Sequence, residues 1–350
     1  MSLHRSQMPS ETLEQLRKGI VIPAHPLALD AGRRLDARRQ RALSRYYIDA
    51  GAGGLAVGVH ATQFAIREAG LYEPVLALAA ETAASWAKRP LVMIAGLSGS
   101  TAQAKREAGT ALAHGYHAGM LSLAAMKGAS EDELVEHCAA VAEAIPLIGF
   151  YLQPAVGGIP LPARFWRRFC EIENVVAIKV APFDRYATLD VVKGMVAARA
   201  ENRIVLYTGN DDHIVLDLLL PLAVKRGADE IRVRFKGGLL GHWSVWTRSA
   251  VALLERIQRA EGADEDLLAL DARVTDCNSA FFDVANGFAG CIPGCHEVLR
   301  RQGLLEGTWC LDPNERLSPG QSEEIDRVCR EHADLSDDDF VRANVGRWLA

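Results

Sequence analysis

Short apolar runs, most of them rich in Val and Ile, recur along the first two thirds of the chain. Most are nearly continuous in hydrophobicity, which is typical of parallel strands buried on both faces. The last run alternates, with Arg232 and Arg234 between apolar residues, and has the weakest strand pattern. The runs predict eight strands, at Gly19–Pro23, Gly54–Gly58, Leu91–Gly96, Gly119–Leu123, Ile148–Pro154, Val175–Ala181, Ile204–Gly209 and Glu230–Phe235.

The segments between these runs carry apolar residues at helical spacing. Ser130 with Glu133 three residues later has the pattern of a capping box, and Pro162 suits a first helical turn. The predicted helices include Ala37–Asp49, Glu81–Ala87, Ala102–Ala113, Glu131–Ala144, Leu189–Ala200 and His213–Lys225.

Eight strand–helix units predict an α/β fold of the (β/α)8 TIM-barrel type, which takes about 250 residues. A doubly wound open sheet is the competing fold, but it needs a glycine fingerprint after its first strand, where this chain has Ala24-His25-Pro26-Leu27. After about residue 250 only helical patterns continue. We therefore expect a barrel with a short N-terminal leader over residues 1–247 and a C-terminal helical region packed on it over residues 248–350.

Composition and charge narrow the range of partners. The 350 residues are 49% hydrophobic and 24% charged, which is ordinary for a globular protein, and the formal net charge is −5. That balance gives no long-range attraction to nucleic acid or anionic lipid, so small molecules are the expected partners. Seven scattered cysteines, the absence of an apolar signal region at the start and the lack of a long apolar stretch predict a cytoplasmic protein.

Barrel proteins of this type carry their sites at the carboxyl ends of the strands, and Lys179 is the outstanding residue there. It is the single charged residue in the apolar run Val175–Ala181. Desolvation lowers the pKa of an amine, which yields a neutral nucleophile able to form a Schiff base with a carbonyl compound. The plainer interpretation is a lysine that reaches solvent or pairs with a carboxylate such as Asp184.

Tyr151, in the preceding predicted strand, is the candidate proton relay. Neighbouring strands lie about 4.8 Å apart, so its hydroxyl is expected to reach the amine of Lys179. A core tyrosine with a satisfied hydroxyl is the alternative.

These residues resemble the dihydrodipicolinate synthase and N-acetylneuraminate lyase group of Schiff-base aldolases. The resemblance rests on Tyr151-Leu152-Gln153-Pro154, on Lys179 placed 28 positions after Tyr151, and on the turn Tyr207–Asp211, which is similar to the family's glycine-plus-acid turn. It implies that Lys179 forms the imine, that Tyr151 relays protons, that the substrates are 2-oxo acids such as pyruvate, and that the chain forms homo-oligomers, dimers or tetramers.

The chain also departs from the family's pattern. Where the family has a hydroxyl-rich loop that grips the substrate carboxylate, this chain has Gly58-Val59-His60-Ala61. A true dihydrodipicolinate synthase would have an arginine near Val156 and a tyrosine near Met126. This chain has neither. The predicted substrate-binding residues are His60, Val59, Gly209, Asn210 and Ile231.

The leading hypothesis is a Schiff-base-forming lyase acting on a small 2-oxo acid or related carbonyl compound, with no cofactor and no metal required. An alternative is an altered barrel that binds a small metabolite without turnover. A metal-dependent hydrolase fits poorly, because its ligands would have to come from His25, His60 and Asp211 and no strand-end His-x-His pair is present.

Overall fold

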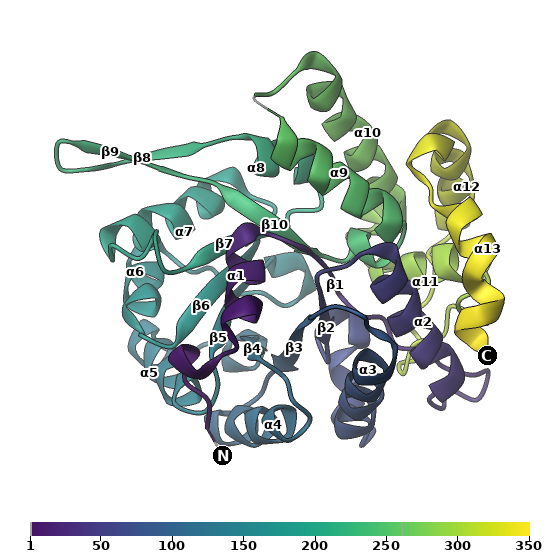
Figure 1. Cartoon of the computed structure of the whole chain (residues 1–350), viewed down its shortest axis with the longest axis horizontal. Helices are drawn as coiled ribbons and strands as arrows, with labels where there is room; N and C mark the ends of the chain where they lie inside the picture. Colours follow the sequence, from purple (N-terminus) through teal and green to yellow (C-terminus); the bar gives the residue numbers. More distant parts are fainter. Residues whose placement is uncertain (1, 261) are drawn as a thin grey trace. The chain divides into compact units, whose positions relative to one another are not determined.

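The computed structural model describes residues 2–260 and 262–350, and its central feature is an eight-stranded parallel sheet. The strand order is β1-β10-β7-β6-β5-β4-β3-β2, and a parallel bridge between Ala24 and Ala56 joins the two ends of that order. Strands alternate with helices, so the predicted (β/α)8 TIM barrel is confirmed (Figure 1). The strands are β1 Val21–Pro23, β2 Gly54–Val57, β3 Val92–Leu97, β4 Ala118–Leu121, β5 Leu147–Leu152, β6 Val175–Ala181, β7 Val205–Thr208 and β10 Phe235–Leu240.

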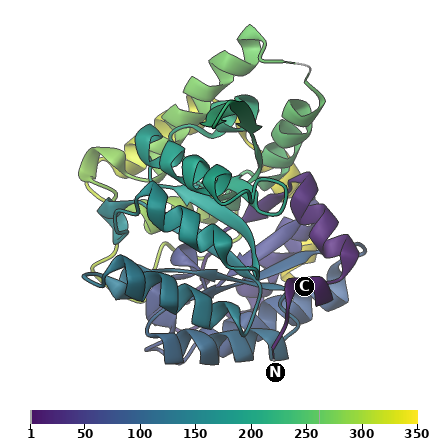
Figure 2. The ribbon, with the colours of Figure 1, turned by 90° about the vertical axis from the view of Figure 1, so that its left-hand side faces the viewer.

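Helices follow the strands, and several more follow the last one, as the sequence pattern predicts. Figure 2 shows α5, α6 and α7 packed along one side of the strands that precede them. The helices are α1 Ser10–Lys18, α2 Ala37–Ala50, α3 Tyr72–Trp86, α4 Thr101–Ala113, α5 Glu131–Ala142, α6 Ala163–Glu171, α7 Arg185–Ala197, α8 Ile214–Leu219, α9 Thr247–Arg259, α10 Glu265–Phe281, α11 Cys291–Arg301, α12 Gln321–Glu331 and α13 Asp338–Leu349. Among the described residues, no helix is long and apolar enough to cross a membrane.

The contacts divide the chain into two compact units. The first combines Met1–Gly19 with Val92–Gly238, and the second combines Ile20–Leu91 with Leu239–Ala350. The first therefore holds β3 to β7 with their helices, and the second holds β1, β2 and the C-terminal helices. The boundary predicted at residue 247 stays a prediction.

The core of the first unit includes an aromatic cluster on α6. Phe165, Trp166 and Phe169 are buried, and the ring of Trp166 lies 5.7 Å from that of Phe169. On β5, a Cβ at Gly149 would lie 2.8 Å from the ring of Phe169, so only glycine lets helix and strand come this close. Because side chains alternate along a strand, this contact identifies the face of β5 that is turned toward α6.

The segment before the last barrel strand differs from the sequence prediction. In place of a helix over 213–225 and a strand over 230–235, α8 ends at Leu219 and an antiparallel hairpin follows, made of β8 Leu222–Arg226 and β9 Asp229–Val233. Figure 1 shows the hairpin extending away from α8. Pro221 ends the helix because proline disfavours helical geometry in the residue before it, and Gly227 supplies the positive φ of the tight turn.

The structure places Ile231 in this hairpin and not on a barrel strand, and its predicted substrate-binding role stays a prediction. Ile231 pairs with Val224 inside the hairpin, whereas the eighth barrel strand is β10, whose Gly237 and Gly238 pair with β7. The alternation of apolar residues with Arg232 and Arg234 belongs to a hairpin strand with one exposed face, which is the usual origin of such a pattern.

Candidate functional site

Lys179 is the one charged side chain of β6 and lies near the strand's carboxyl end. It is buried, with 8% of its surface exposed. In register it lies between Phe150 of β5 and Tyr207 of β7, and paired residues of parallel strands point to the same face of the sheet. Its Nζ lies 4.6 Å from the centre of the Phe150 ring, so the amine rests on an aromatic face.

Burial lowers the pKa of Lys179 from 10.5 to about 8, and the Asp211 carboxylate opposes this shift. About one Lys179 in ten is then neutral at pH 7, against a negligible fraction for an ordinary lysine. Asp184, the partner that the plainer interpretation names, accepts hydrogen bonds from the backbone of Tyr186 and Ala187 at the start of α7. Lys179 is thus a buried amine with a lowered pKa, which is the kind of perturbed group that marks a candidate functional site.

Gly209 makes room for the lysine side chain. A Cβ at this position would lie 2.6 Å from Cε of Lys179 and 2.8 Å from Cβ of Ala181. Both distances are too short for a real Cβ, so the turn after β7 can pass against the lysine only with glycine here. Gly209, predicted as a substrate-binding residue, therefore lies directly beside Lys179.

Asn210 is buried within a scaffold of polar side chains. Its amide nitrogen donates to Asp217 (2.9 Å) and its oxygen accepts from the backbone of Phe183 (3.0 Å). Thr208 also donates to Asp217 (2.6 Å), and Arg185 forms an ion pair with the same carboxylate. The side chain of Asn210 therefore fixes the turn that carries Gly209, and the substrate-binding role predicted for Asn210 stays a prediction.

Asp211 follows in the same turn. It is buried, with 8% of its surface exposed, and it is the charged group that acts on Lys179. Lys179, Phe150, Gly209 and Asp211 all belong to the first unit.

Tyr151 does not point toward Lys179. It pairs in register with Val180 and faces away from the amine, toward α6. Its ring lies 5.2 Å from that of Trp166, and its hydroxyl accepts a hydrogen bond from the backbone of Leu161 (3.1 Å). Burial raises the pKa of this hydroxyl. In this register Phe150 lies beside the lysine, and the proton-relay role predicted for Tyr151 stays a prediction.

One extra residue in β6 causes this exchange. Leu147 pairs with Val175, but the next residue of β5, Ile148, pairs with Ala177. Val176 is thus an unmatched residue, and a shift of one residue reverses the face of every side chain after it. Without the shift, the spacing of 28 would have paired Tyr151 with Lys179.

His60 and Val59 belong to the second unit, in the loop after β2. Val59 is buried and precedes the short 3-10 helix η2 His60–Thr62. Thr62 fixes the loop, because its hydroxyl accepts from the backbone of Gly58 (3.0 Å) and donates to the carbonyl of His25 (2.6 Å). The ring of His60 is partly exposed and lies 5.8 Å from that of Phe64. The roles predicted for Val59 and His60 stay predictions.

His25 is committed to the interior of the same unit. Its Nε2 lies 2.8 Å from the Ser44 hydroxyl, and its Nδ1 lies 2.9 Å from the carbonyl of Pro26. Burial lowers its pKa to about 4, so the ring is neutral near pH 7. With both nitrogens in hydrogen bonds, His25 is a poor metal ligand.

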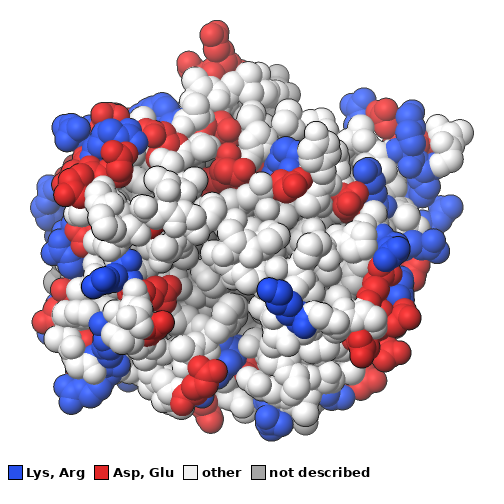
Figure 3. Space-filling view, turned by 180° about the vertical axis from the view of Figure 1, so that it is seen from behind, with Lys and Arg blue, Asp and Glu red and all other residues white. Residues whose placement is uncertain are grey.

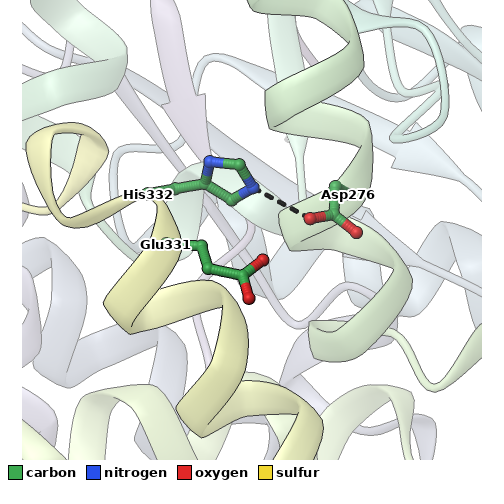
Figure 4. Close-up of side chains that lie close together, drawn as sticks. All are labelled: Asp276, Glu331 and His332. Atoms are coloured by element: carbon green, nitrogen blue, oxygen red, sulfur yellow. Dashed lines mark hydrogen bonds and ion pairs between the residues drawn. The ribbon is translucent and has the colours of Figure 1, made fainter.

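Asp276, Glu331 and His332 form the one cluster with metal-ligand geometry among the described residues (Figure 4). Asp276 comes from α10 and the other two from the end of α12, and Nε2 of His332 lies 2.8 Å from a carboxylate oxygen of Asp276. The guanidinium of Arg327 already contacts both carboxylates at 2.9 Å. The positive charge of the Arg327 guanidinium therefore already lies between the two carboxylates. Together these side chains form an ion-pair network that joins α10 to α12.

Sequence reasoning missed Phe150 and Asp217. Phe150 lies next to Tyr151, the residue that the sequence analysis selected. No sequence signal marks the unmatched Val176, which sets the register that brings Phe150 to Lys179. Asp217 is an acidic residue in an apolar run, which resembles the isolated charge that revealed Lys179.

Together, the closed parallel sheet and the buried strand lysine define a (β/α)8 barrel protein with an amine-centred candidate site. The chain belongs to the dihydrodipicolinate synthetase family, whose model matches residues 18–224, more than half of its length. Membership supports a lyase of the class I aldolase type. No curated protein sequence matches the chain.

Solved structures show the same fold at low sequence identity. Dihydrodipicolinate synthase from Oceanobacillus iheyensis has a TM-score of 0.74 and 17% identity, over 93% of this chain and 99% of that one. The synthase from Acinetobacter baumannii complexed with pyruvate has a TM-score of 0.73 and 19% identity, over 90% and 99%. N-acetylneuraminate lyase from Fusobacterium nucleatum has a TM-score of 0.71 and 16% identity, over 90% and 98%.

Proposed function

We propose that the protein is a Schiff-base-forming lyase that acts on a small 2-oxo acid or a related carbonyl compound. The observation that carries the proposal is the amine of Lys179, buried in a barrel strand with its pKa lowered to about 8. A lysine held partly neutral at this position has the property that imine chemistry needs. Family membership and the pyruvate complex of a similar protein support the choice of carbonyl substrate.

In the proposed reaction the neutral amine attacks the carbonyl carbon, and the resulting carbinolamine loses water to give a protonated imine. The imine then accepts the electron pair of the breaking carbon–carbon bond as an enamine, while the hydroxyl of the departing fragment loses its proton and becomes an aldehyde. Protonation of the enamine carbon and hydrolysis by water release the keto product and return the amine.

We assign the proton transfers to Asp211. It is the buried carboxylate that acts electrostatically on Lys179, and Gly209, two residues earlier in the same turn, touches the lysine side chain. As a carboxylate it can accept the hydroxyl proton and later deliver it to the enamine carbon, which is the role that a general acid–base residue performs. Tyr151 has no part in this scheme.

Borohydride trapping tests the proposal. The protein is incubated with pyruvate and other 2-oxo acids, reduced and analysed by peptide mass spectrometry. We expect a reduced adduct on the peptide containing Lys179, lost in Lys179→Ala and retained in the control Lys193→Ala, whose side chain lies exposed on α7. No adduct with any oxo acid, or an adduct that survives Lys179→Ala, would overturn the proposal.

Binding without turnover is the second candidate, and the outward orientation of Tyr151 favours it. In that case a metabolite raises the melting temperature of the wild type and of Lys179→Ala equally, and no tested oxo acid is consumed. A trapped adduct together with consumption of the oxo acid rejects this candidate.

A further inference from the structure

A cavity of about 430 Å³ lies in the first unit at the amino end of β7. Gly209 and the candidate site lie beyond the carboxyl end of the same strand. Segments far apart in sequence form its walls, namely the end of α1, the start of β7 and the base of the β8–β9 hairpin. Four basic residues are part of its lining, namely Arg17, Arg232, Arg234 and Lys236.

Hydrogen bonds hold these walls together. The hydroxyl of Tyr207 donates to the carbonyl of Leu16, which fixes the end of α1 against β7 (2.7 Å). Arg234 donates to the carbonyl of Leu219 (2.5 Å), which ties the segment after β9 to the end of α8. In the hairpin, Leu222 pairs with Val233. The cavity is therefore built by fixed elements, and its size falls in the range of small-molecule sites.

The lining combines an apolar floor with a basic rim. Ile204, Val205, Leu206 and Val233 are buried, whereas the four basic side chains belong to exposed residues. Glu201 is the one acidic residue of the lining, and Arg226 from the hairpin holds one of its oxygens (2.7 Å). The rim thus concentrates positive charge in a chain whose formal net charge is −5.

The surface around the hairpin has the same character. Figure 3 shows Lys and Arg side chains gathered over the hairpin, on the right of that view. In the hairpin, Glu230 accepts a hydrogen bond from Arg232 (3.1 Å), and both side chains are exposed, so this pair is weak.

We propose that this cavity is a second ligand site, which takes a small organic anion with an apolar body and a phosphate or carboxylate group. The apolar part would pack on Ile204, Leu206 and Val233, and the charged group would lie among Arg17, Arg232 and Arg234. Arginine suits this role because its planar donors match carboxylate and phosphate groups. The site is independent of the imine chemistry proposed for Lys179.

Calorimetry on the full chain measures the binding of phenyl phosphate, with inorganic phosphate and phenol as its separated halves. We expect phenyl phosphate to bind more tightly than either half, and its affinity to fall as salt rises from about 50 mM to about 500 mM. Arg17→Glu and Arg232→Glu should each weaken binding at least about tenfold. Lys127→Glu, an exposed reversal elsewhere in the same unit, should leave it unchanged.

Equal binding in the wild type and both arginine variants overturns the proposal, as does a failure to bind phenyl phosphate. Melting curves establish whether each variant is folded. If Arg17→Glu or Arg232→Glu does not fold, Arg17→Gln or Arg232→Gln takes its place in the binding experiment. Lys179→Ala should bind the probe as the wild type does. A wild type that binds the probe but forms no adduct would overturn the proposed function alone, whereas a wild type that forms the adduct but does not bind the probe would overturn this site alone.

Discussion

Lys179 owes its chemistry to its neighbours. Apolar strand residues remove water from the amine, Phe150 offers it an aromatic face, and Asp211 offsets part of the cost of its charge. The sequence was enough to select this residue, because a lone lysine in an apolar barrel strand is rarely accidental. Its partner could not be selected in the same way, since the facing side chain depends on strand register.

The pKa of about 8 for Lys179 sets the pH dependence of adduct formation. The neutral amine is the reactive form, so the trapping rate should rise with pH and level off above about 8, with about a tenth of the plateau rate at pH 7. Asp211→Asn removes the negative charge that favours the ammonium form, so the midpoint should move to lower pH. A pH-independent rate, or a midpoint near 10.5, would contradict the assignment.

Tyr151→Phe should leave adduct formation nearly intact, within about threefold, because the hydroxyl contacts the backbone of Leu161 instead of the amine. Losing that hydrogen bond should cost about 1 kcal/mol of unfolding free energy, measured in urea. In contrast, Asp211→Asn should slow turnover at the plateau pH at least about 100-fold. A loss of that size in Tyr151→Phe would return the tyrosine to the reaction.

At the scale of elements, the turn after β7 is built to pass beside the lysine. Gly209→Ala places a Cβ 2.6 Å from Lys179 and should displace the amine, abolishing the adduct and costing about 1–3 kcal/mol. Gly109→Ala in α4 meets no atom within 4 Å and should stabilise the protein by up to about 1 kcal/mol. Trapping and urea unfolding of both variants check this pair. Full adduct formation in Gly209→Ala would refute the close approach.

Asp217 joins α8 to the same turn through Thr208 and Asn210. Asp217→Ala leaves buried donors without an acceptor and should cost about 2–4 kcal/mol in urea unfolding. Asp190→Ala, whose carboxylate lies partly exposed on α7, should change stability by less than about 0.5 kcal/mol. Similar effects in the two variants would mean that the network does not hold the turn.

The error at the eighth strand also belongs to this scale. Barrel strand β10 has two glycines and little of the apolar continuity of the other strands, whereas the hairpin strand before it has a clear alternating pattern. The hydrophobic period alone therefore favours the hairpin strand β9 as the eighth strand. The barrel instead uses β10, because β7 needs a parallel partner.

At the scale of the whole molecule, the eightfold alternation of strands and helices was predictable, because each parallel strand is buried on both faces and leaves a continuous apolar run. The C-terminal helices were predictable from their spacing. The division into two compact units had no counterpart in the sequence, since each unit combines segments that are distant along the chain.

The network at α10 and α12 predicts the behaviour in acid. Hydrogen bonds from Arg327 lower the pKa of Asp276 from 3.8 to about 2. The ion pairs of Asp276 therefore stabilise the fold fully at pH values above its ordinary pKa, and this stabilisation is lost as the pH falls through about 2. The melting temperature of the wild type should therefore fall more between pH 4 and pH 2 than that of Asp276→Asn. Asp339→Asn, a nearly fully exposed control, should behave as the wild type.

Added zinc should leave the melting temperature unchanged near pH 7, because Arg327 already occupies the space between the carboxylates. A clear rise that disappears in Asp276→Asn would show that a metal can displace the guanidinium.

The unmatched Val176 has a consequence for how relatives of this chain are compared. A sequence alignment compares residues by their order along the chain. Here Tyr151 and Lys179 keep their order and spacing, but the shift in register leaves Tyr151 on the opposite face of the sheet from Lys179. Two sequences can therefore share a tyrosine and a lysine at identical spacing and still differ in whether the two groups ever meet.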